Sequence, residues 1–340
     1  MASRARATED RKDLARRRIM LVLGKQVVAN ARTLEQKIAD AGPAGMRIDP
    51  HVLTPARREL QDEGLVQAIN RGGNTWYHLA NANPDIVDAR LVEVLGLFRA
   101  FTANNLPGRL GQTLEIATYR ALLSLPDLEF YGRFSDLETH DDATIYSKTE
   151  PPNHIGARVL PGDRRLDFMV RHPEAGYLGI ECKNIREWLY PDRDEITDLL
   201  LKCTSLNCVP VLIGRRIPFV TFKVLTTTGV IVHQTYNQLL PSADIEVAAR
   251  IKHKDGLGYH DIRLGNQPDA RLTKFITENM MAVAPAARER MDQYFDLLAA
   301  FGSGDMNYTE FAARVRRRAA GANEDNDWPE EEEPEFDDWQ

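Results

Sequence analysis

Apolar residues recur at helical spacing through the first part of the chain. Two such stretches, residues 14–31 and 34–41, predict helices. A third helix is expected to begin at Thr54, which suits an N-cap, with Pro55 in the first helical position. Gly64 suits the left-handed residue that often ends a helix. The pattern therefore predicts helices in succession, the last of them ending at this glycine.

Two short extended runs follow. Residues 65–69 and 75–79 have strand-like composition, and the glycines of the turn at 71–74 tolerate the positive φ angles of a hairpin. After a polar connector at 81–85, apolar residues return at helical spacing over 89–102. We therefore expect a hairpin and then a helix that links it to the rest of the chain.

The middle of the chain alternates between strand and helix patterns. Helices are predicted at 111–123 and 195–205, and 128–131 can begin a strand. The apolar run 208–214 is typical of a buried central strand. A polar segment at 135–162 is expected to be a long loop, and loops of that length are usually functional or disordered.

A second predicted hairpin consists of strands 166–170 and 177–183 around a turn at 172–176. Successive side chains of a strand point to opposite faces. The second strand is therefore expected to present Leu178, Ile180 and Cys182 on one face, and Gly179, Glu181 and Lys183 on the other.

Three charged residues should meet at one end of this hairpin. Asp167 is expected to point away from Leu166 and Phe168, and the hairpin brings it beside Glu181 and Lys183. Two neighbouring carboxylates repel each other unless a cation lies between them, and hard oxygen ligands favour Mg²⁺. A lysine beside them can position a water molecule and offset phosphate charge. These groups suit phosphodiester hydrolysis.

Composition narrows the class of protein. The chain has 340 residues, 43% hydrophobic, and a net charge of −7, but residues 322–340 contain ten acidic and no basic side chains, so the rest carries +3. Such asymmetry points toward nucleic-acid chemistry. Three cysteines without paired spacing favour a reducing cytoplasm. The apolar runs are too short to span a bilayer, and neither zinc-binding histidine spacing nor a phosphate-binding Gly-Lys loop occurs.

With Asp167, Glu181 and Lys183 so spaced, residues 108–240 resemble the PD-(D/E)XK nuclease superfamily, the restriction-endonuclease-like fold. The resemblance implies a mixed α/β sheet flanked by helices, and makes Asp167 and Glu181 metal ligands and catalytic residues, with Lys183 as the catalytic lysine. It adds the backbone carbonyl of Cys182 to the metal ligands. Leu166 departs from the proline of the family name.

The same resemblance offers a role for the predicted helix 111–123. Some relatives use a carboxylate on this helix as an additional metal ligand, and Glu115 is the candidate here. The alternative is an ordinary surface glutamate. The implied cofactor is Mg²⁺, for which Mn²⁺ can substitute, and the implied products carry a 5′-phosphate and a 3′-hydroxyl.

The first helices and hairpin resemble a winged helix-turn-helix domain. In such domains the third helix enters the DNA major groove, which would place Arg57, Arg58 and Gln61 toward bases or phosphates. Arg71 at the tip of the wing would reach the backbone or minor groove. Winged helices also serve as protein-binding modules, so this alternative stays open.

The predicted organisation has five parts, arranged as follows: a basic arm at 1–14 that is either a frayed end or a phosphate contact, a winged helix-turn-helix domain at 15–82, a linker helix at 83–106, a nuclease-like domain with a helical C-terminal part at 107–301, and a basic cluster with a disordered acidic tail at 302–340.

The predicted function is that of a metal-dependent DNA endonuclease, in a prokaryotic restriction, defence or mobile-element setting. The alternative is a non-enzymatic DNA-binding regulator whose nuclease-like domain is only a scaffold. The predicted partner is DNA, with no membrane, and cutting both strands favours a homodimer. The acidic tail is either a solvated end, an autoinhibitor that mimics DNA in the cleft, or a docking segment for a protein partner.

Overall fold

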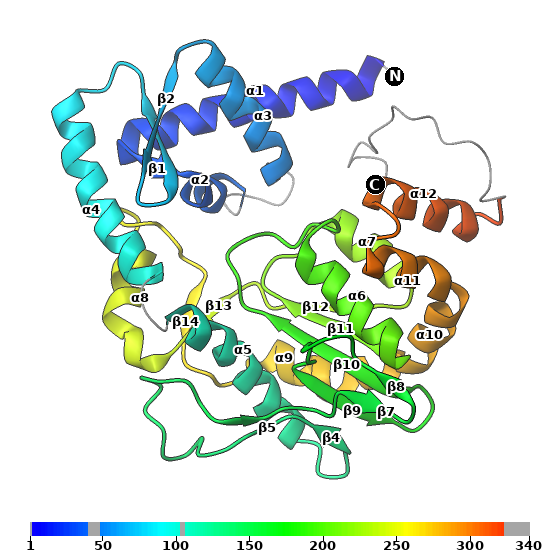
Figure 1. Ribbon diagram of the computed structural model, residues 1–340. Coiled ribbons are helices and arrows are strands. Elements are labelled where there is room, and N and C mark those ends of the chain that lie inside the picture. The colour runs from blue at the N-terminus through cyan, green and yellow to red at the C-terminus, as the bar shows by residue number, and fades with distance from the viewer. Residues whose placement is uncertain (1, 40–47, 103–105, 323–340) are drawn as a thin grey trace. The chain divides into compact units, whose positions relative to one another are not determined.

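A computed structural model describes residues 2–39, 48–102 and 106–322 (Figure 1). The acidic residues 323–340, the expected roles of the tail and the predicted helix end at 40–41 lie outside the described residues. The chain packs as two units: Met1–Pro107 with Asp244–Ile262, and Gly108–Ala243 with Arg263–Gln340. No described helix is both long and apolar enough to cross a membrane.

The first unit consists of helices around a small antiparallel sheet of strand order β1-β3-β2. Its elements are α1 (Ala2–Gln26), β1 (Ala29–Asn30), α2 (Ala31–Ile38), α3 (Pro50–Asp62), β2 (Val66–Arg71), β3 (Asn74–Leu79), α4 (Pro84–Thr102) and α8 (Ile245–Lys252). Helix α1 packs against α2, α3 and β3. Ala56 and Leu60 face inward from α3, and the Trp76 ring meets Phe98 edge-on at 5.8 Å, so the apolar pattern fixes the core as expected.

Helix boundaries in this unit differ from the prediction: α1 begins at Ala2, α2 at Ala31 and α4 at Pro84, each earlier than expected. Two further differences have a clear physical reason. The first helix ends at Gln26 because Val27 has a positive φ of 64° and Ala29–Asn30 pair with β3. Helix α3 begins at Pro50 and not at Thr54, since a proline without an N–H suits a first turn and the N–H of Val52 donates to Asp49 O at 3.0 Å. The glycine end is confirmed: Gly64 has φ 71°.

The basic arm is helical, because α1 extends over most of residues 1–14. Lys12 forms an ion pair with Glu59 of α3. Arg16, one turn further on, pairs with Glu59 at 3.3 Å and with Glu63 at 2.6 Å. These contacts attach the helix to α3. Lys12 is therefore part of a packed helix, and it lies neither in a frayed end nor in a free phosphate-binding arm.

A segment that the sequence assigned to the second domain joins the first unit. Residues 244–262 include α8, which packs against α4. Lys37 donates to Lys254 O at 2.7 Å, Arg90 donates to Asp255 O, and the Tyr259 ring meets Phe101 edge-on at 5.7 Å. These contacts bring together residues more than 150 positions apart, which helical periodicity cannot reveal.

The second unit is built on a mixed five-stranded sheet of order β12-β11-β10-β9-β4 (Figure 1). The elements from α5 to the C-terminal side are α5 (Leu106–Leu123), β4 (Phe130–Tyr131), β5 (Arg133–Phe134), β6 (Lys148–Thr149), β7 (His154–Ile155), β8 (Arg158–Val159), β9 (Phe168–His172), β10 (Gly176–Lys183), α6 (Asp194–Leu206), β11 (Val209–Gly214), α7 (Phe219–Thr227), β12 (Ile231–Gln234), β13 (Gln238–Leu240), a 3-10 turn (Ser242–Asp244), β14 (Ile262–Leu264), α9 (Ala270–Lys274), a π-helical turn (Phe275–Asn279), α10 (Met280–Gln293), α11 (Phe295–Ser303) and α12 (Tyr308–Ala319).

Helices α5 and α6 cover opposite faces of this sheet. Strand β9 is antiparallel to β10, and β11 is parallel to β10. Cys182 of β10 contacts Thr118 of α5 (Sγ–Oγ1 3.4 Å), whereas its neighbour Glu181 contacts Lys202 of α6. Because adjacent side chains of a strand point to opposite faces, the two helices must lie on opposite sides. The expected mixed sheet flanked by helices is confirmed at this level, and β11 is buried throughout.

Close packing of α6 against β10 depends on Gly179. A Cβ atom at this position would lie 2.9 Å from the sulfur atoms of Cys203 and Cys208 and from Leu166 Cδ1. Cys203 and Cys208 are core residues at this contact, and all three cysteines of the chain are buried and free. The glycine on the Glu181 face lets the helix approach closely enough for its polar residues to reach that face.

The C-terminal part also differs from the prediction. The basic cluster belongs to α12, which buries Phe311 and Val315, and its Arg318 pairs with Asp296 of α11 at 2.6 Å. This arginine therefore serves a helix–helix contact. The segment from residue 302 to residue 322 is part of the packed unit, because the apolar face of α12 covers α11.

Candidate active site

The β9–β10 hairpin brings Asp167 next to the end of β10. The main-chain N–H of Asp167 donates to Ile180 O at 3.1 Å, and Asp167 Oδ2 accepts the N–H of Cys182 at 2.6 Å. Strand β9 begins one residue later, at Phe168, since the chain bends at Asp167. The expectation that Leu166 and Phe168 share a face is therefore wrong: Leu166 packs toward α6, and Phe168 stacks on Tyr119 of α5.

A glycine that sequence reasoning missed lies against this bend. Gly132 has φ 99°, and a Cβ atom there would lie 2.7 Å from Asp167 O and 2.8 Å from the Phe168 ring. A side chain at this position would have to displace the backbone that carries Asp167. Gly132 thus sets the position of the Asp167 carboxylate through main-chain contact.

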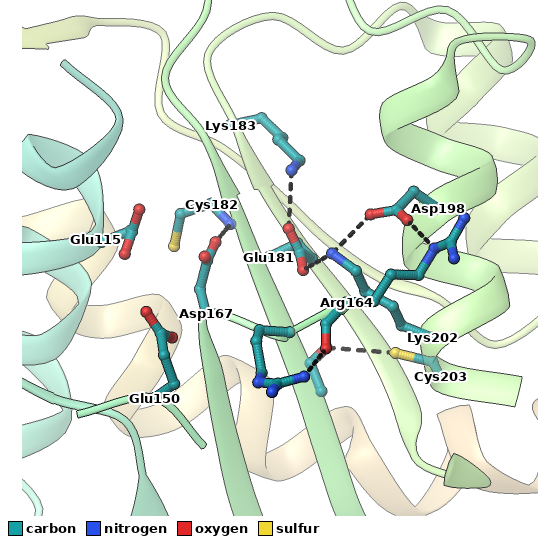
Figure 2. Close-up of polar contacts among 12 residues, drawn as sticks. Glu115, Glu150, Arg164, Asp167, Glu181, Cys182, Lys183, Asp198, Lys202 and Cys203 are labelled. Atoms are coloured by element: carbon teal, nitrogen blue, oxygen red, sulfur yellow. Dashed lines mark hydrogen bonds and ion pairs between the residues drawn. The ribbon is translucent and has the colours of Figure 1, made fainter. Parts of the chain in front are cut away.

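Glu181 is held between two lysines (Figure 2). Its Oε2 atom lies 2.8 Å from Lys183 Nζ, and its Oε1 atom lies 2.7 Å from Lys202 Nζ. The side chain is only 2% exposed. Burial and the charge of Asp167 raise the pKa of Glu181, against the two lysines. The predicted contact between Glu181 and Lys183 is present, and Lys202 adds a second cation.

Lys202 continues into a chain of ion pairs on α6. Its Nζ atom lies 2.6 Å from Asp198 Oδ2, one helical turn earlier, and Asp198 Oδ1 accepts Arg164 Nε at 2.9 Å. Burial opposes the charge of Lys202, but Glu181 and Asp198 outweigh it and raise its pKa. Both lysines that hold Glu181 are therefore charged at neutral pH, Lys183 because Glu181 and Asp167 raise its pKa in the same way.

On the other side of the site, Glu115 and Glu150 lie toward Asp167 (Figure 2). Lys148 of β6 joins them: its Nζ atom is 2.6 Å from Glu115 Oε2, 3.4 Å from Glu150 Oε2 and 3.7 Å from Asp167 Oδ1. Burial and the charge of Glu115 raise the pKa of Asp167 to about 6, even though Lys148 and Lys183 act against the shift. The side chain of Glu115 is 15% exposed, so the alternative of a surface glutamate is disfavoured.

The thiol of Cys182 takes no part in this cluster. It points to the α5 face, and burial raises its pKa far above that of a free cysteine, so it stays protonated. Only the main-chain carbonyl of Cys182 remains as a candidate ligand. Among the residues that the structure describes, no three acidic, histidine or cysteine side chains converge closely enough to hold one metal ion.

An open hollow of about 440 Å³ adjoins Lys183. Its lining comes from Lys183, from the first turns of α6 and from two neighbouring segments. These residues are Arg164, Lys183, Asp194, Glu195, Thr197, Asp198, Leu201 and Gly302. A substrate could therefore reach the exposed side of Lys183, whose side chain is 22% exposed.

The candidate DNA-contacting residues lie in the first unit. Arg58 and Arg71 are exposed, on α3 and at the end of β2, and Gln61 is half-buried. The Arg57 guanidinium lies 4.2 Å from the centre of the Tyr77 ring, and burial lowers its pKa. Arg57 therefore packs within the unit, and Arg58 and Arg71 are the more accessible pair.

Two lysines of the site escaped sequence reasoning. Lys202 follows Asp198 by four residues on a largely apolar helix, and that pair was a usable signal for a polar contact at the sheet. Lys148 lies in the long polar segment 135–162, which forms the short strands β6, β7 and β8, and nothing in its neighbours marks it.

The arrangement brings a bend, a strand end and two helices to one cluster of acidic and basic groups. Asp167, Glu181 and Lys183 lie together, and Glu115 joins them through Lys148. Such clusters of buried charges with raised carboxyl pKa values are typical of functional sites. Comparison with protein-family models, with curated proteins and with solved structures finds no match to this chain.

Proposed function

We propose that the protein is a metal-dependent DNA endonuclease that hydrolyses phosphodiester bonds. The observation that carries the proposal is the cluster at the end of the β9–β10 hairpin, where the half-buried Asp167 lies near the buried Glu181, and Lys183 lies 2.8 Å from Glu181. Buried like charges cost free energy, and a site for a cation explains why the chain keeps them together.

The fold supports this proposal. In the second unit a helix precedes an antiparallel hairpin, and a helix and a parallel strand follow it, which is the order expected of the restriction-endonuclease-like fold. In the first unit, three helices and an antiparallel hairpin are the parts of a winged helix-turn-helix domain. In this proposal the first unit binds DNA and the second cuts it.

The donors suit Mg²⁺, with Mn²⁺ as a substitute. Asp167 and Glu181 offer carboxylate oxygens, which these hard cations prefer, and each oxygen can accept more than one partner. Their raised pKa values fit a position where a cation is needed to stabilise the charged forms. We assign the ion to Asp167, Glu181 and the Cys182 carbonyl; when bound, it would polarise the scissile phosphate and acidify a water molecule.

The lysines of the cluster then have distinct roles. Lys183 is partly exposed beside the hollow, so it can orient a water molecule and offset phosphate charge. Lys202 is 8% exposed and has no comparable access. It acts as a positioning residue that fixes the orientation of the Glu181 carboxylate from α6.

One observation favours the non-enzymatic alternative, a DNA-binding regulator with a nuclease-like scaffold. Both oxygens of Glu181 already contact lysines, so the charges of the cluster are largely balanced without a metal ion. A direct assay separates the two functions. Purified full-length protein should nick or cut plasmid DNA in Mg²⁺, lose that activity in EDTA and regain it with excess Mg²⁺.

Single-stranded DNA and RNA serve as parallel substrates in that assay, because the site itself does not define the polynucleotide. DNA binding without cleavage of any of the three, in Mg²⁺ or in Mn²⁺, would favour the regulator. Cleavage that persists unchanged in EDTA would contradict the metal-dependent mechanism.

DNA binding by the first unit gives a separate prediction. Replacing Arg58 or Arg71 by alanine should weaken DNA affinity and reduce the slope of log K against log salt concentration by about one for each phosphate interaction that the substitution removes. Fluorescence anisotropy at several salt concentrations measures both. Arg250→Ala, which removes an exposed arginine of α8 in the same unit, is the matched control and should leave the slope unchanged.

The wider setting belongs to the same proposal. A winged helix joined to this nuclease type suits a prokaryotic restriction, defence or mobile-element enzyme that acts in the cytoplasm. The buried free cysteines agree with a reducing compartment. A homodimer would supply the two active sites that cutting both strands requires.

A further inference from the structure

Lys148 is a buried lysine that lies among the carboxylates of the candidate active site. Its side chain is 6% exposed, and three carboxylates surround its ammonium group, those of Glu115, Glu150 and Asp167, at 2.6, 3.4 and 3.7 Å. Lysine side chains are rarely this buried unless they are paired. The proposed metal-binding function of the cluster does not use this cation, so its role needs a separate explanation.

The position of the ammonium group is fixed from several directions. Besides the carboxylates, the Phe168 and Phe134 rings lie with their centres 5.1 and 5.6 Å from Nζ, and aromatic faces attract a cation. Three carboxylates within 4 Å of Nζ stabilise the charged form of the lysine. A positive charge therefore lies between Glu115 and Asp167.

This position determines which carboxylates are open to a metal ion. A Mg²⁺ or Mn²⁺ ion shared by Glu115 and Asp167 would need the space that the ammonium group fills, since such ions bind carboxylate oxygens at about 2.0–2.1 Å. Moving the lysine away would separate its charge from the carboxylates that stabilise it.

We propose that Lys148 takes the place of a second metal ion between Glu115 and Asp167, so that the active site binds a single divalent ion. Glu115 then anchors the lysine and is not a metal ligand. This inference rests on the proposed nuclease function. It adds that the positive charge next to Asp167 comes from the ammonium group of Lys148 and not from a second metal ion. The lysine supplies one fixed positive charge where a second ion would supply two.

Manganese binding to the full-length protein tests the inference without an activity measurement. Electron paramagnetic resonance detects free and bound Mn²⁺, and spin–spin coupling reports two ions that lie close together. Wild-type protein should bind one Mn²⁺ ion at the site. The variant Lys148→Met, which keeps the apolar stem against Phe134 and Phe168, should bind two coupled ions. The double variant Glu115→Gln/Lys148→Met should return to one.

Asp167→Asn provides the background, because it keeps every acidic residue of the C-terminal tail and should lose the specific ion. Glu115→Gln with Lys148 intact decides the matter even if Lys148→Met does not fold. It keeps an oxygen for the lysine and should bind one ion with affinity within about threefold of wild type, whereas removal of a true ligand or its support weakens binding about 10–100-fold.

Two results would overturn the inference alone. These are two coupled Mn²⁺ ions in the wild-type protein, or a folded Lys148→Met variant that still binds one. Either leaves the nuclease proposal intact if plasmid cleavage depends on metal. Wild-type protein that binds no specific Mn²⁺ and cuts no polynucleotide would overturn both the inference and the proposed function.

Discussion

Asp167→Asn is expected to reduce metal-dependent DNA cleavage about a hundredfold to a thousandfold, which is the scale seen when a charge-stabilising group is removed from an active site. The asparagine keeps the shape of the side chain, and its oxygen can still accept the Cys182 N–H, which donates to Asp167 at 2.6 Å. It lacks the negative charge that a metal ion requires. DNA affinity should stay within about threefold, because binding draws on many phosphate contacts. Single-turnover cleavage and fluorescence anisotropy measure the two effects.

Asp163→Asn is the matched control, since it removes an exposed carboxylate from the segment just before β9. It should cut DNA at nearly the wild-type rate. An Asp167→Asn variant that retains more than about a tenth of wild-type activity would exclude Asp167 as a metal ligand. Parallel loss of DNA binding would contradict the assignment of binding to the first unit and of chemistry to the second.

The variant Asp167→Asn should also be more stable than the wild-type protein in EDTA at pH 7. The folded pKa of Asp167 is about 6, above the ordinary value of 3.8, because of burial and Glu115. A raised folded pKa means that the native state prefers the proton, so stability is lost as the pH rises from about 4 to about 6. At pH 7 the full cost is present, about 2 kcal/mol after allowance for the 20% exposure of the side chain. Asparagine has no such cost. Urea unfolding should therefore show a gain that disappears below about pH 4.

This pH dependence also separates a catalytic role from a structural one. A carboxylate kept for stability would make the substitution destabilising at pH 7, whereas a charge kept for function makes it stabilising and inactive. Mg²⁺ should reverse the order, because the ion stabilises the wild-type native state in proportion to its binding and has no comparable site in the variant. Unfolding curves with and without Mg²⁺ measure this directly.

The sequence contained the information for the local part of the site. Alternation along β10 places Glu181 and Lys183 on one face and Cys182 on the other, as the contacts to α6 and α5 confirm. Hairpin pairing brings Asp167 to the same end of the sheet. The alternation along β10 and the pairing with β9 both depend only on neighbouring residues and on a tight turn. Local patterns determine these placements because a strand offers each side chain only two directions.

The rest of the site depends on tertiary packing that periodicity does not encode. Lys148 reaches Glu115 from 33 residues away through a polar segment without a clear pattern. Gly132 matters because the backbone of Asp167 passes close to it, which no local preference of the glycine reveals. In the first unit the start of α3 was missed for a different reason, because Asp49-Pro50 and Thr54-Pro55 are equally good helix starts and only the packing of the turn selects between them.

Lys202→Met should have the largest effect on stability, a decrease of about 3 kcal/mol at pH 7. Glu181 is 2% exposed and Lys202 8%, so the substitution removes one of two cations that face a buried carboxylate. Asp198 keeps its contact to Arg164 and is 33% exposed, so water can solvate it. Urea unfolding of full-length protein measures the change. Lys223→Met removes an exposed lysine from α7 and should change stability by less than about 0.5 kcal/mol.

The double variant Glu181→Gln/Lys202→Met separates the ion pair from a simple packing effect. If the cost arises from an uncompensated charge at Glu181, neutralising that carboxylate should recover most of the stability, and the two substitutions should couple by about 1–3 kcal/mol. Additive effects would instead mean that the lysine stem stabilises α6 by packing alone. Cleavage should stay low in the double variant even when stability returns, because the amide at 181 no longer supplies a charged ligand, whereas Lys202→Met alone should keep the ligand but hold it less firmly.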